Sequence, residues 1–324
     1  MDCIIDMPVD EMEHYTGINE KPYDFDEYWK NGIREMENLG TEYELIPSSF
    51  QVAEAQCYDL YFIGIGGARI HAHYIRPSAI NERIPAVCMF HAYATNCGQF
   101  SDKLRWTAVR YAFAAMDCRG QNGSSVDCIP VIGNTLNGHI IRGLDDPDSR
   151  RMYYRNVYLD AAQLIRILMT MDEIDPEKIG VFGSSQGGGI SLACAALTPS
   201  INRVAAVMPF LSDFRRVCQM GRDQEAYAEL RSYFRNFDPR NLREKEIFTK
   251  LGYIDIHHLA PYIKSKVLMF TGLMDEKCPP STQYAVYNMI RSPKEHLLYP
   301  QFSHEGYPES DDIIMQYMLE MKKQ

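Results

Sequence analysis

The sequence predicts an α/β fold in which a mostly parallel sheet is flanked by helices. Short apolar runs, typical of buried strands, alternate with helical segments along most of the 324 residues, and this alternation favours a parallel sheet covered on both faces. The composition, 46% hydrophobic and 23% charged, is sufficient for one large core, and no repeat or linker divides the sequence. We therefore expect a single domain over residues 1–324.

The first half of the chain begins with an N-terminal extension over about residues 1–55, in which apolar side chains at helical spacing predict a helix over residues 22–39. Two strand-like runs joined by a glycine-rich turn predict a β-hairpin. The two strands of this hairpin are expected at 58–63 and 69–75, and further strands at 85–90 and 111–116. We also expect a helix near 104–109 and a core helix with one apolar face over 153–171.

The second half continues the alternation with strands at 178–182, 204–208, 266–272 and 296–300. A helical, charged and aromatic segment over about residues 213–263 interrupts this rhythm. We expect it to be a lid-like insertion before the strand at 266–272. Its aromatic side chains, Tyr227, Tyr233, Phe234 and Phe237, could line a binding pocket or pack between subunits, and we favour packing between subunits.

The segment Gly-Ser-Ser-Gln-Gly at residues 183–187 follows a strand and precedes a helix. This is the context of a nucleophile elbow, the G-x-S-x-G turn of the α/β-hydrolase fold, in which the central serine is the nucleophile. The spacing selects Ser185 over Ser184. Gly183 and Gly187 are needed because neighbouring backbone passes too close for a Cβ atom. A lone match of this kind also occurs in structural turns, so the partners of the serine decide its meaning.

The two partners are found in the order that this fold requires, an acid and then a histidine, each after a later strand. Asp275 follows the strand at 266–272, and His304 follows the strand at 296–300. Alone, Asp275 could be a turn former and His304 a surface histidine. Together with Ser185 they predict a triad in which the imidazole takes the serine proton and the carboxylate orients the imidazole.

The oxyanion of such a reaction requires two backbone N–H donors. We assign them to Gln186, at the start of the helix after the serine, and to Tyr93, in the loop after the strand at 85–90.

Charge and composition exclude several function classes. The formal net charge of −10 argues against a nucleic-acid surface. No apolar run approaches the roughly 18 residues that a membrane span needs. The nine cysteines show no paired spacing, which favours reduced thiols and a cytoplasmic location. His71 and His73 share a strand face but lack an obvious third ligand, so we expect no metal.

Several short motifs taken together resemble the acetyl xylan esterase and cephalosporin C deacetylase family of the α/β-hydrolase superfamily. They are Arg-Gly-Gln at 119–121, Gly-Ser-Ser-Gln-Gly-Gly at 183–188, Gly-Leu-Met-Asp at 272–275 followed by Cys-Pro-Pro-Ser-Thr at 278–282, and His-Glu at 304–305. The likeness spans nearly the whole chain. It implies the roles given above for the triad and the oxyanion hole, and a supporting role for Arg119, Gln121 and Glu305.

The resemblance also implies a serine esterase that removes acetyl groups from small acetylated substrates such as xylo-oligosaccharides and cephalosporin C-like esters. It implies no cofactor and no metal, and a homohexamer. The chain departs from the family pattern at Ala92, where the family usually has glycine, which puts the geometry of the oxyanion hole in question. A longer-chain acyl esterase or peptidase on the same framework, or a catalytically silent scaffold, remains as an alternative.

Overall fold

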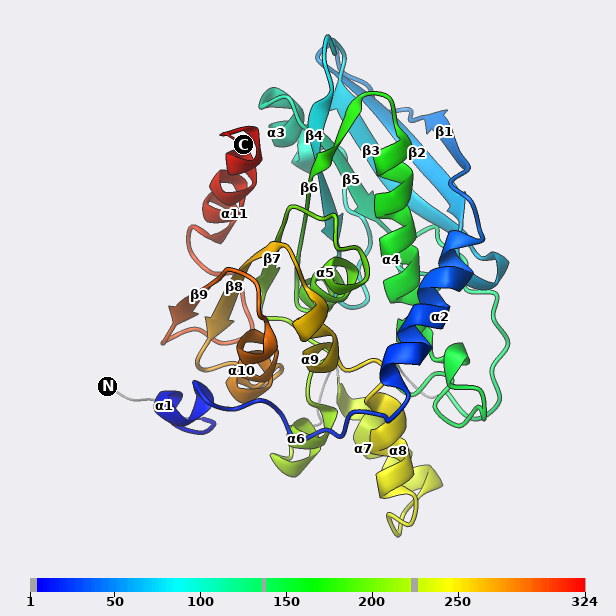
Figure 1. The fold of residues 1–324 in the computed structure, drawn as a ribbon, viewed down its shortest axis with the longest axis vertical. Helices are drawn as coiled ribbons and strands as arrows, with labels where there is room; N and C mark the ends of the chain where they lie inside the picture. The colour runs from blue at the N-terminus through cyan, green and yellow to red at the C-terminus, as the bar shows by residue number, and fades with distance from the viewer. Residues whose placement is uncertain (1–4, 136–137, 223–226, 324) are drawn as a thin grey trace.

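A nine-stranded sheet forms the centre of the protein (Figure 1), whose computed structural model describes residues 5–135, 138–222 and 227–323. The strands are β1 (Tyr43–Pro47), β2 (Ala55–Ile63), β3 (Arg69–Pro77), β4 (Ile84–Phe90), β5 (Ala112–Met116), β6 (Ile174–Ser184), β7 (Arg203–Val207), β8 (Lys266–Gly272) and β9 (Lys294–Tyr299). The helices are α1 (Val9–Met12), α2 (Phe25–Glu37), α3 (Leu104–Ala108), α4 (Tyr153–Thr170), α5 (Gln186–Leu197), α6 (Phe214–Gln219), α7 (Ala228–Phe237), α8 (Glu244–Leu251), α9 (Ile256–Leu259), α10 (Pro280–Met289) and α11 (Ser310–Leu319). Short 3-10 helices are η1 (Ile65–Gly67), η2 (Ser101–Lys103), η3 (Ser149–Arg151), η5 (Ala260–Tyr262) and η6 (Glu320–Lys323).

The strand order in the sheet is β1-β2-β3-β5-β4-β6-β7-β8-β9. The first three neighbouring pairs, β1 with β2, β2 with β3 and β3 with β5, are antiparallel. The remaining neighbouring pairs, from β5 with β4 to β8 with β9, are parallel. The predicted α/β-hydrolase fold with a mostly parallel sheet is thus confirmed. Because parallel strands end at the same edge of a sheet, the loops that follow β4, β6, β7, β8 and β9 lie close together there.

Helices cover both faces of the sheet. Figure 1 shows α5 beside β6 and β7, with α4 next to it and α2 lying along α4. These helices share one apolar cluster with the sheet, whereas Trp106 of α3 and Met318 of α11 belong to a second cluster on the opposite face. The sheet is therefore shielded from solvent on both sides, as its near-continuous apolar strands require.

The core helix α4 differs from its prediction. We expected one apolar face, but fifteen of its eighteen residues are buried. The physical reason is α2, which covers the outward side of α4: Trp29 stacks on Tyr158 with ring centroids 6.0 Å apart, and Gly32 lies against Leu159. The N-terminal extension is thus a second layer over the core helix.

Two further expectations need correction. The extension also contributes the edge strand β1, which the sequence did not predict because its side chains are mostly exposed and show no alternation.

In the insertion, Tyr227 and Tyr233 are buried within this chain. Tyr227 packs on Phe210, with ring centroids 4.4 Å apart. Packing between subunits is therefore wrong for these two side chains.

A buried ion pair ties the loop after β5 to α4. Arg119 donates to both carboxylate oxygens of Asp160 at 2.7 Å and to the carbonyl oxygen of Ile65 at 3.0 Å. The backbone N–H of Ile65 in turn donates to Asp160 at 3.1 Å. Both side chains are fully buried. This network fixes the start of the Arg-Gly-Gln segment against the core.

We expect Asp160→Asn to lower the free energy of unfolding by about 3 kcal/mol, because it removes the hydrogen-bonded counter-charge of the buried Arg119 guanidinium and leaves only Asp127, 3.8 Å away. Urea unfolding measures the change. Asp311→Asn is the matched control: it breaks the exposed pair with Arg105 and should cost less than about 1 kcal/mol. Equal losses in the two variants would contradict the assignment of the buried pair.

Candidate active site

Ser185 occupies the sharp turn between β6 and α5. Its φ of 55° lies in the left-handed region, and its N–H donates to the carbonyl oxygen of Val207 at 2.9 Å. A Cβ atom on Gly183 or Gly187 would collide with the backbone of Phe90. The two glycines are therefore needed for the close approach of β4, and the strained serine has the conformation of a nucleophile elbow.

The structure brings the three predicted catalytic side chains into one hydrogen-bonded chain. His304 Nε2 lies 3.0 Å from Ser185 Oγ, and His304 Nδ1 lies 2.8 Å from Asp275 Oδ2. Asp275 is fully buried, whereas His304 is partly exposed. The order and distances match those of a serine, a base and an orienting carboxylate.

The carboxylate of Asp275 is held from its other side. Its Oδ1 accepts the backbone N–H groups of Lys277 at 2.9 Å and Cys278 at 2.8 Å. Gln283 Nε2 donates to Oδ2 at 3.3 Å. One oxygen is thus pinned by the loop after β8, which leaves the other to face His304.

Cys278 is a neighbour of the triad that the sequence interpretation missed. Its Sγ lies within 4.8 Å of a carboxylate oxygen of Asp275 and a ring nitrogen of His304. Complete burial raises the pKa of its thiol well above the usual value. Cys278 is therefore a small, uncharged side chain packed beside the triad. The available signals were its place three residues after Asp275 and its position at the start of the Cys-Pro-Pro-Ser-Thr motif, which gave it no role by itself.

The two residues assigned to the oxyanion hole flank this chain. Gln186 is the first residue of α5, and the N–H groups of a first helical turn have no partner within the helix. Tyr93 lies in the loop after β4 and lines a cleft together with Ser185 and His304. The assignment of their N–H groups to an oxyanion remains a proposal.

The cleft has a volume of about 820 Å³. Apolar side chains of the sheet and of α11 form its floor, including Met89, Phe182 and Ile314. Polar and charged side chains stand at its rim, where Arg105 and Asp311 form an exposed ion pair at 3.0 Å. The cleft therefore offers an apolar surface beside the serine and a polar entrance.

Glu305 lies at this rim, exposed, and accepts the N–H of Ser303 at 3.1 Å. Gln121 lies deeper and exchanges hydrogen bonds with the side chain of Gln186 at 2.8 and 3.2 Å. These contacts, with those of Arg119, favour the supporting roles implied by the resemblance, which remain predictions.

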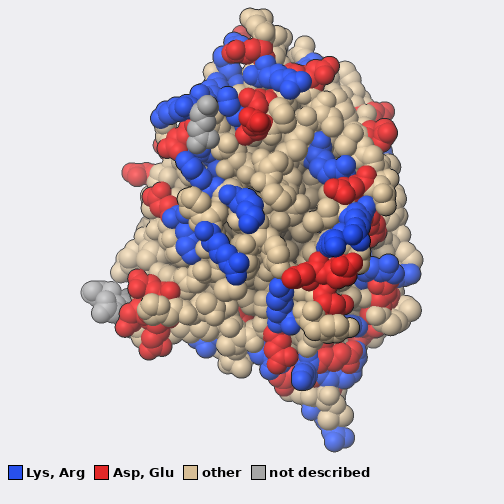
Figure 2. Space-filling view, in the orientation of Figure 1, with Lys and Arg blue, Asp and Glu red and all other residues tan. Residues whose placement is uncertain are grey.

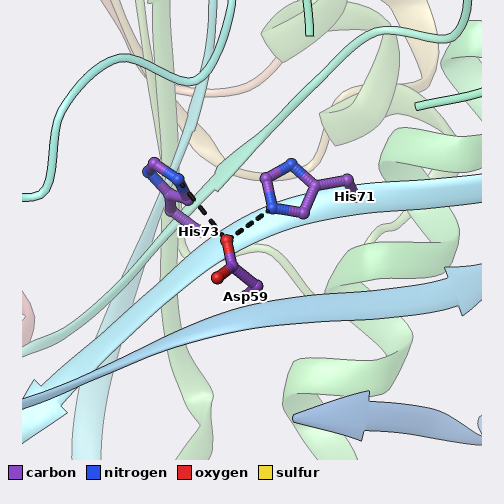
Figure 3. Close-up of side chains that lie close together, drawn as sticks. All are labelled: Asp59, His71 and His73. Atoms are coloured by element: carbon purple, nitrogen blue, oxygen red, sulfur yellow. Dashed lines mark hydrogen bonds and ion pairs between the residues drawn. The ribbon is translucent and has the colours of Figure 1, made fainter. Parts of the chain in front are cut away.

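A second cluster of titratable side chains lies on β2 and β3 (Figure 3). Asp59 is directly opposite His73 in the register, and His71 shares that face. Asp59 Oδ1 is 2.9 Å from His71 Nε2 and 3.7 Å from His73 Nε2. The sequence interpretation that the two histidines lack a third ligand was therefore wrong, because the hairpin register supplies Asp59.

Two contacts favour a hydrogen-bonded network over a bound cation in this cluster. His71 lies between two carboxylates, since its Nδ1 is 2.7 Å from Asp117. Burial lowers the pKa of His71, but the two carboxylates outweigh it and raise the pKa overall. Lys103 Nζ lies 3.5 Å from His73 Nδ1, the nitrogen that must carry a proton when Nε2 binds a metal. The expectation of no metal remains a prediction.

Glu229 of α7 is a buried carboxylate next to the active-site loops. It accepts the backbone N–H groups of His139, Ile140 and Ile141 at 2.8–3.0 Å. Burial raises its pKa to about 7 from the usual 4.5, against the effect of these donors. Because the folded state holds the proton more tightly, this group favours folding below about pH 4.5, and that contribution is lost as the pH rises through about 7.

We expect Glu229→Gln to remove this pH dependence. The pKa difference corresponds to at most about 3 kcal/mol between the two ends of the window. The change in Tm from pH 5 to pH 8 should therefore be smaller in the variant than in the wild type. An identical change in both proteins would show that Glu229 titrates normally.

Comparison with known proteins places this geometry in a family. The chain matches the acetyl xylan esterase (AXE1) family over residues 1–321. It is 52% identical to acetyl xylan esterase 1 from Thermoanaerobacterium sp. JW/SL YS485, with a TM-score of 0.96 over 98% of this chain and 99% of that one. For the acetyl xylan esterase from Paenibacillus sp. R4, the identity is 30% and the TM-score 0.92, over 97% and 99% of the two chains.

A curated relative, the acetyl esterase Axe7A from Xylanibacter ruminicola, is 27% identical over 314 residues, which cover 94% of this chain and 67% of the relative. The matches extend over nearly the whole chain, including the elbow, the acid loop and the histidine loop. The chain therefore belongs to the acetyl xylan esterase family, and it is a hydrolytic esterase of the α/β-hydrolase fold.

Proposed function

We propose that this protein is a serine carboxylesterase that removes acetyl groups from small acetylated substrates through Ser185, His304 and Asp275. The observation that carries the proposal is the continuous hydrogen-bonded chain from Asp275 through His304 to Ser185. It lies in a cleft and on the strand ends where this fold places its active site.

In the proposed cycle, Ser185 Oγ attacks the acetyl carbonyl carbon while His304 Nε2 takes the serine proton. His304 then gives that proton to the oxygen of the leaving alcohol, and an acetyl-serine ester remains. A water molecule attacks this ester by the same route and releases acetate. The N–H groups of Tyr93 and Gln186 stabilise the oxyanion in both steps, and the loss of one such donor typically costs about 3 kcal/mol of barrier.

The substrate class rests on the relatives, which are named acetyl xylan esterases or an acetyl esterase. We propose acetylated xylo-oligosaccharides and cephalosporin C-like esters as substrates. The polar rim of the cleft, with Glu305 and the pair of Arg105 and Asp311, is suited to hydroxyl-rich alcohols, since charged groups form strong hydrogen bonds with them.

We further propose a homo-oligomer, a hexamer by analogy with the family. This proposal rests on the family resemblance. Light scattering of the purified protein measures the assembly.

Figure 2 shows basic and acidic side chains interspersed on the face in view, which supports the proposal of no nucleic-acid partner.

None of the helices in the described parts of the chain has both the length and the apolar character needed to cross a bilayer. In those parts, free thiols are found at Cys57, Cys88, Cys97, Cys118, Cys128, Cys194 and Cys278, and Cys3 lies outside the described residues. The free thiols support the proposal of a cytoplasmic location.

Acetate release from a panel of acetylated xylo-oligosaccharides, cephalosporin C and 4-nitrophenyl acetate tests the proposed function. Butyryl and octanoyl esters and a peptide amide test the alternative of a longer-chain esterase or peptidase. We expect acetyl esters to be the best substrates. A preference for octanoyl esters or for the amide would overturn the acetyl assignment, and failure of a fluorophosphonate to label Ser185 would indicate a silent scaffold.

A further inference from the structure

In the loop after β4, the peptide group between Ala92 and Tyr93 is fixed by an unusually large number of hydrogen bonds. The carbonyl oxygen of Ala92 accepts three hydrogen bonds: from the ring of His91 at 2.7 Å, from Thr95 N–H at 3.2 Å and from Thr95 Oγ1 at 2.8 Å. A single carbonyl commonly accepts one or two. This peptide group is the one that joins Ala92 to Tyr93, so its N–H is the predicted oxyanion donor.

The protonation of His91 follows from its contacts. Its Nε2 accepts the backbone N–H of Cys118 at 2.9 Å and so carries no proton. The neutral ring therefore has its proton on Nδ1, which donates to Ala92. Burial lowers the pKa of His91 and keeps the ring neutral. Since Cys118 lies two residues after the end of β5, the ring connects the loop after β4 to the segment that follows the neighbouring strand.

The orientation of the Tyr93 N–H follows from peptide geometry. In a planar trans peptide the C=O and N–H bonds point in opposite directions. Because the carbonyl of Ala92 points toward His91 and Thr95, the N–H of Tyr93 points away from them. Ala92 and Tyr93 line the cleft together with Ser185. Turning the peptide over would break all three hydrogen bonds at once.

The side chain of Gln121 links this loop to the second predicted donor. Its Oε1 accepts the N–H of Ala94 at 3.2 Å, and its amide pairs with that of Gln186 at 2.8 and 3.2 Å. The residues that follow Tyr93 and Ser185 are therefore bridged by one side chain. The bridge limits how far the two N–H groups can separate.

We infer that His91 and Thr95 are positioning residues that hold the Ala92–Tyr93 peptide in its oxyanion-binding orientation before substrate arrives. The inference rests on the proposed function and deepens it. It also answers the question raised by Ala92. The backbone of Ala92 does not have a positive φ, whereas Ala94 does, at 55°. Alanine at position 92 therefore carries no backbone strain, and the strained position is two residues later.

The test compares Thr95→Val with Thr95→Ser, because valine keeps the shape and removes the donor hydroxyl while serine keeps it. Thr95 is exposed, so neither change disturbs the core. We expect Thr95→Val to lower kcat for 4-nitrophenyl acetate about tenfold with KM nearly unchanged, and His91→Gln to lower it by about 10- to 100-fold. Thr95→Ser, which keeps the donor hydroxyl, should restore kcat to within about twofold of the wild type.

A second readout separates positioning from general loss of structure. A boronic acid forms a tetrahedral adduct with an active-site serine and so depends on the oxyanion donors. Its affinity should fall in Thr95→Val by the same factor as kcat, and be restored in Thr95→Ser. Wild-type kcat in Thr95→Val and His91→Gln, or a loss of kcat with unchanged boronic acid affinity, would overturn the inference. An inactive wild-type protein would instead overturn the proposed function.

Discussion

Ser185→Ala is expected to lower kcat for 4-nitrophenyl acetate by about 10⁵-fold while the fold is retained. Without the hydroxyl, no acetyl-enzyme forms, and only slow attack by water within the oxyanion hole remains. The fold should tolerate the change because Ser185 Oγ contacts His304 in the cleft rather than the core. Acetate release and the circular dichroism spectrum are measured. Release should nearly stop, and the spectrum should be unchanged.

The neighbouring serine provides the matched control. Ser184 ends β6, and the hydroxyl that lies within hydrogen-bond distance of His304 Nε2 is that of Ser185. Ser184→Ala should therefore keep most of the activity. Fluorophosphonate labelling should disappear in Ser185→Ala and persist in Ser184→Ala. Substantial turnover in Ser185→Ala, or loss of labelling in Ser184→Ala alone, is incompatible with Ser185 as the nucleophile.

The sequence was sufficient to predict which three side chains meet, because each of them follows a strand of the parallel sheet. Ser185, Asp275 and His304 are far apart in the chain, but the carboxyl ends of β6, β8 and β9 share one edge. The elbow was also predictable, since its backbone conformation demands Gly183 and Gly187 in a short local pattern. Such backbone requirements leave a direct trace in the sequence.

Side-chain networks left no such trace. The pairing of Gln121 with Gln186, and the contact of His91 with Ala92, depend on rotamers and on loops from different strands. The full burial of α4 depends on α2, whose position over it could not be derived from the periodicity of either helix. Asp59 was within reach of prediction, because the hairpin turn sets the register that places it opposite His73.

Asp275→Asn is the second change for which we expect a large effect, a loss of about 10⁴-fold in kcat. The carboxylate oxygen Oδ1 accepts N–H groups of Lys277 and Cys278, so an asparagine must place its carbonyl oxygen there. Its NH₂ group then faces His304 Nδ1, where the wild type has an acceptor. The opposite rotamer would direct the NH₂ group against two backbone donors, which is less favourable still.

An NH₂ donor at this position reverses the role of the imidazole. His304 Nδ1 must then accept, so the proton of the neutral ring moves to Nε2 and faces Ser185, whose proton the ring can no longer take. The substitution keeps size and burial, so stability should change far less than the rate. Glu276→Gln, one residue along and exposed, should keep kcat within about twofold. If Asp275→Asn retained more than about a tenth of kcat, the carboxylate could not be what sets the tautomer of His304, and the base would have to be oriented by another group.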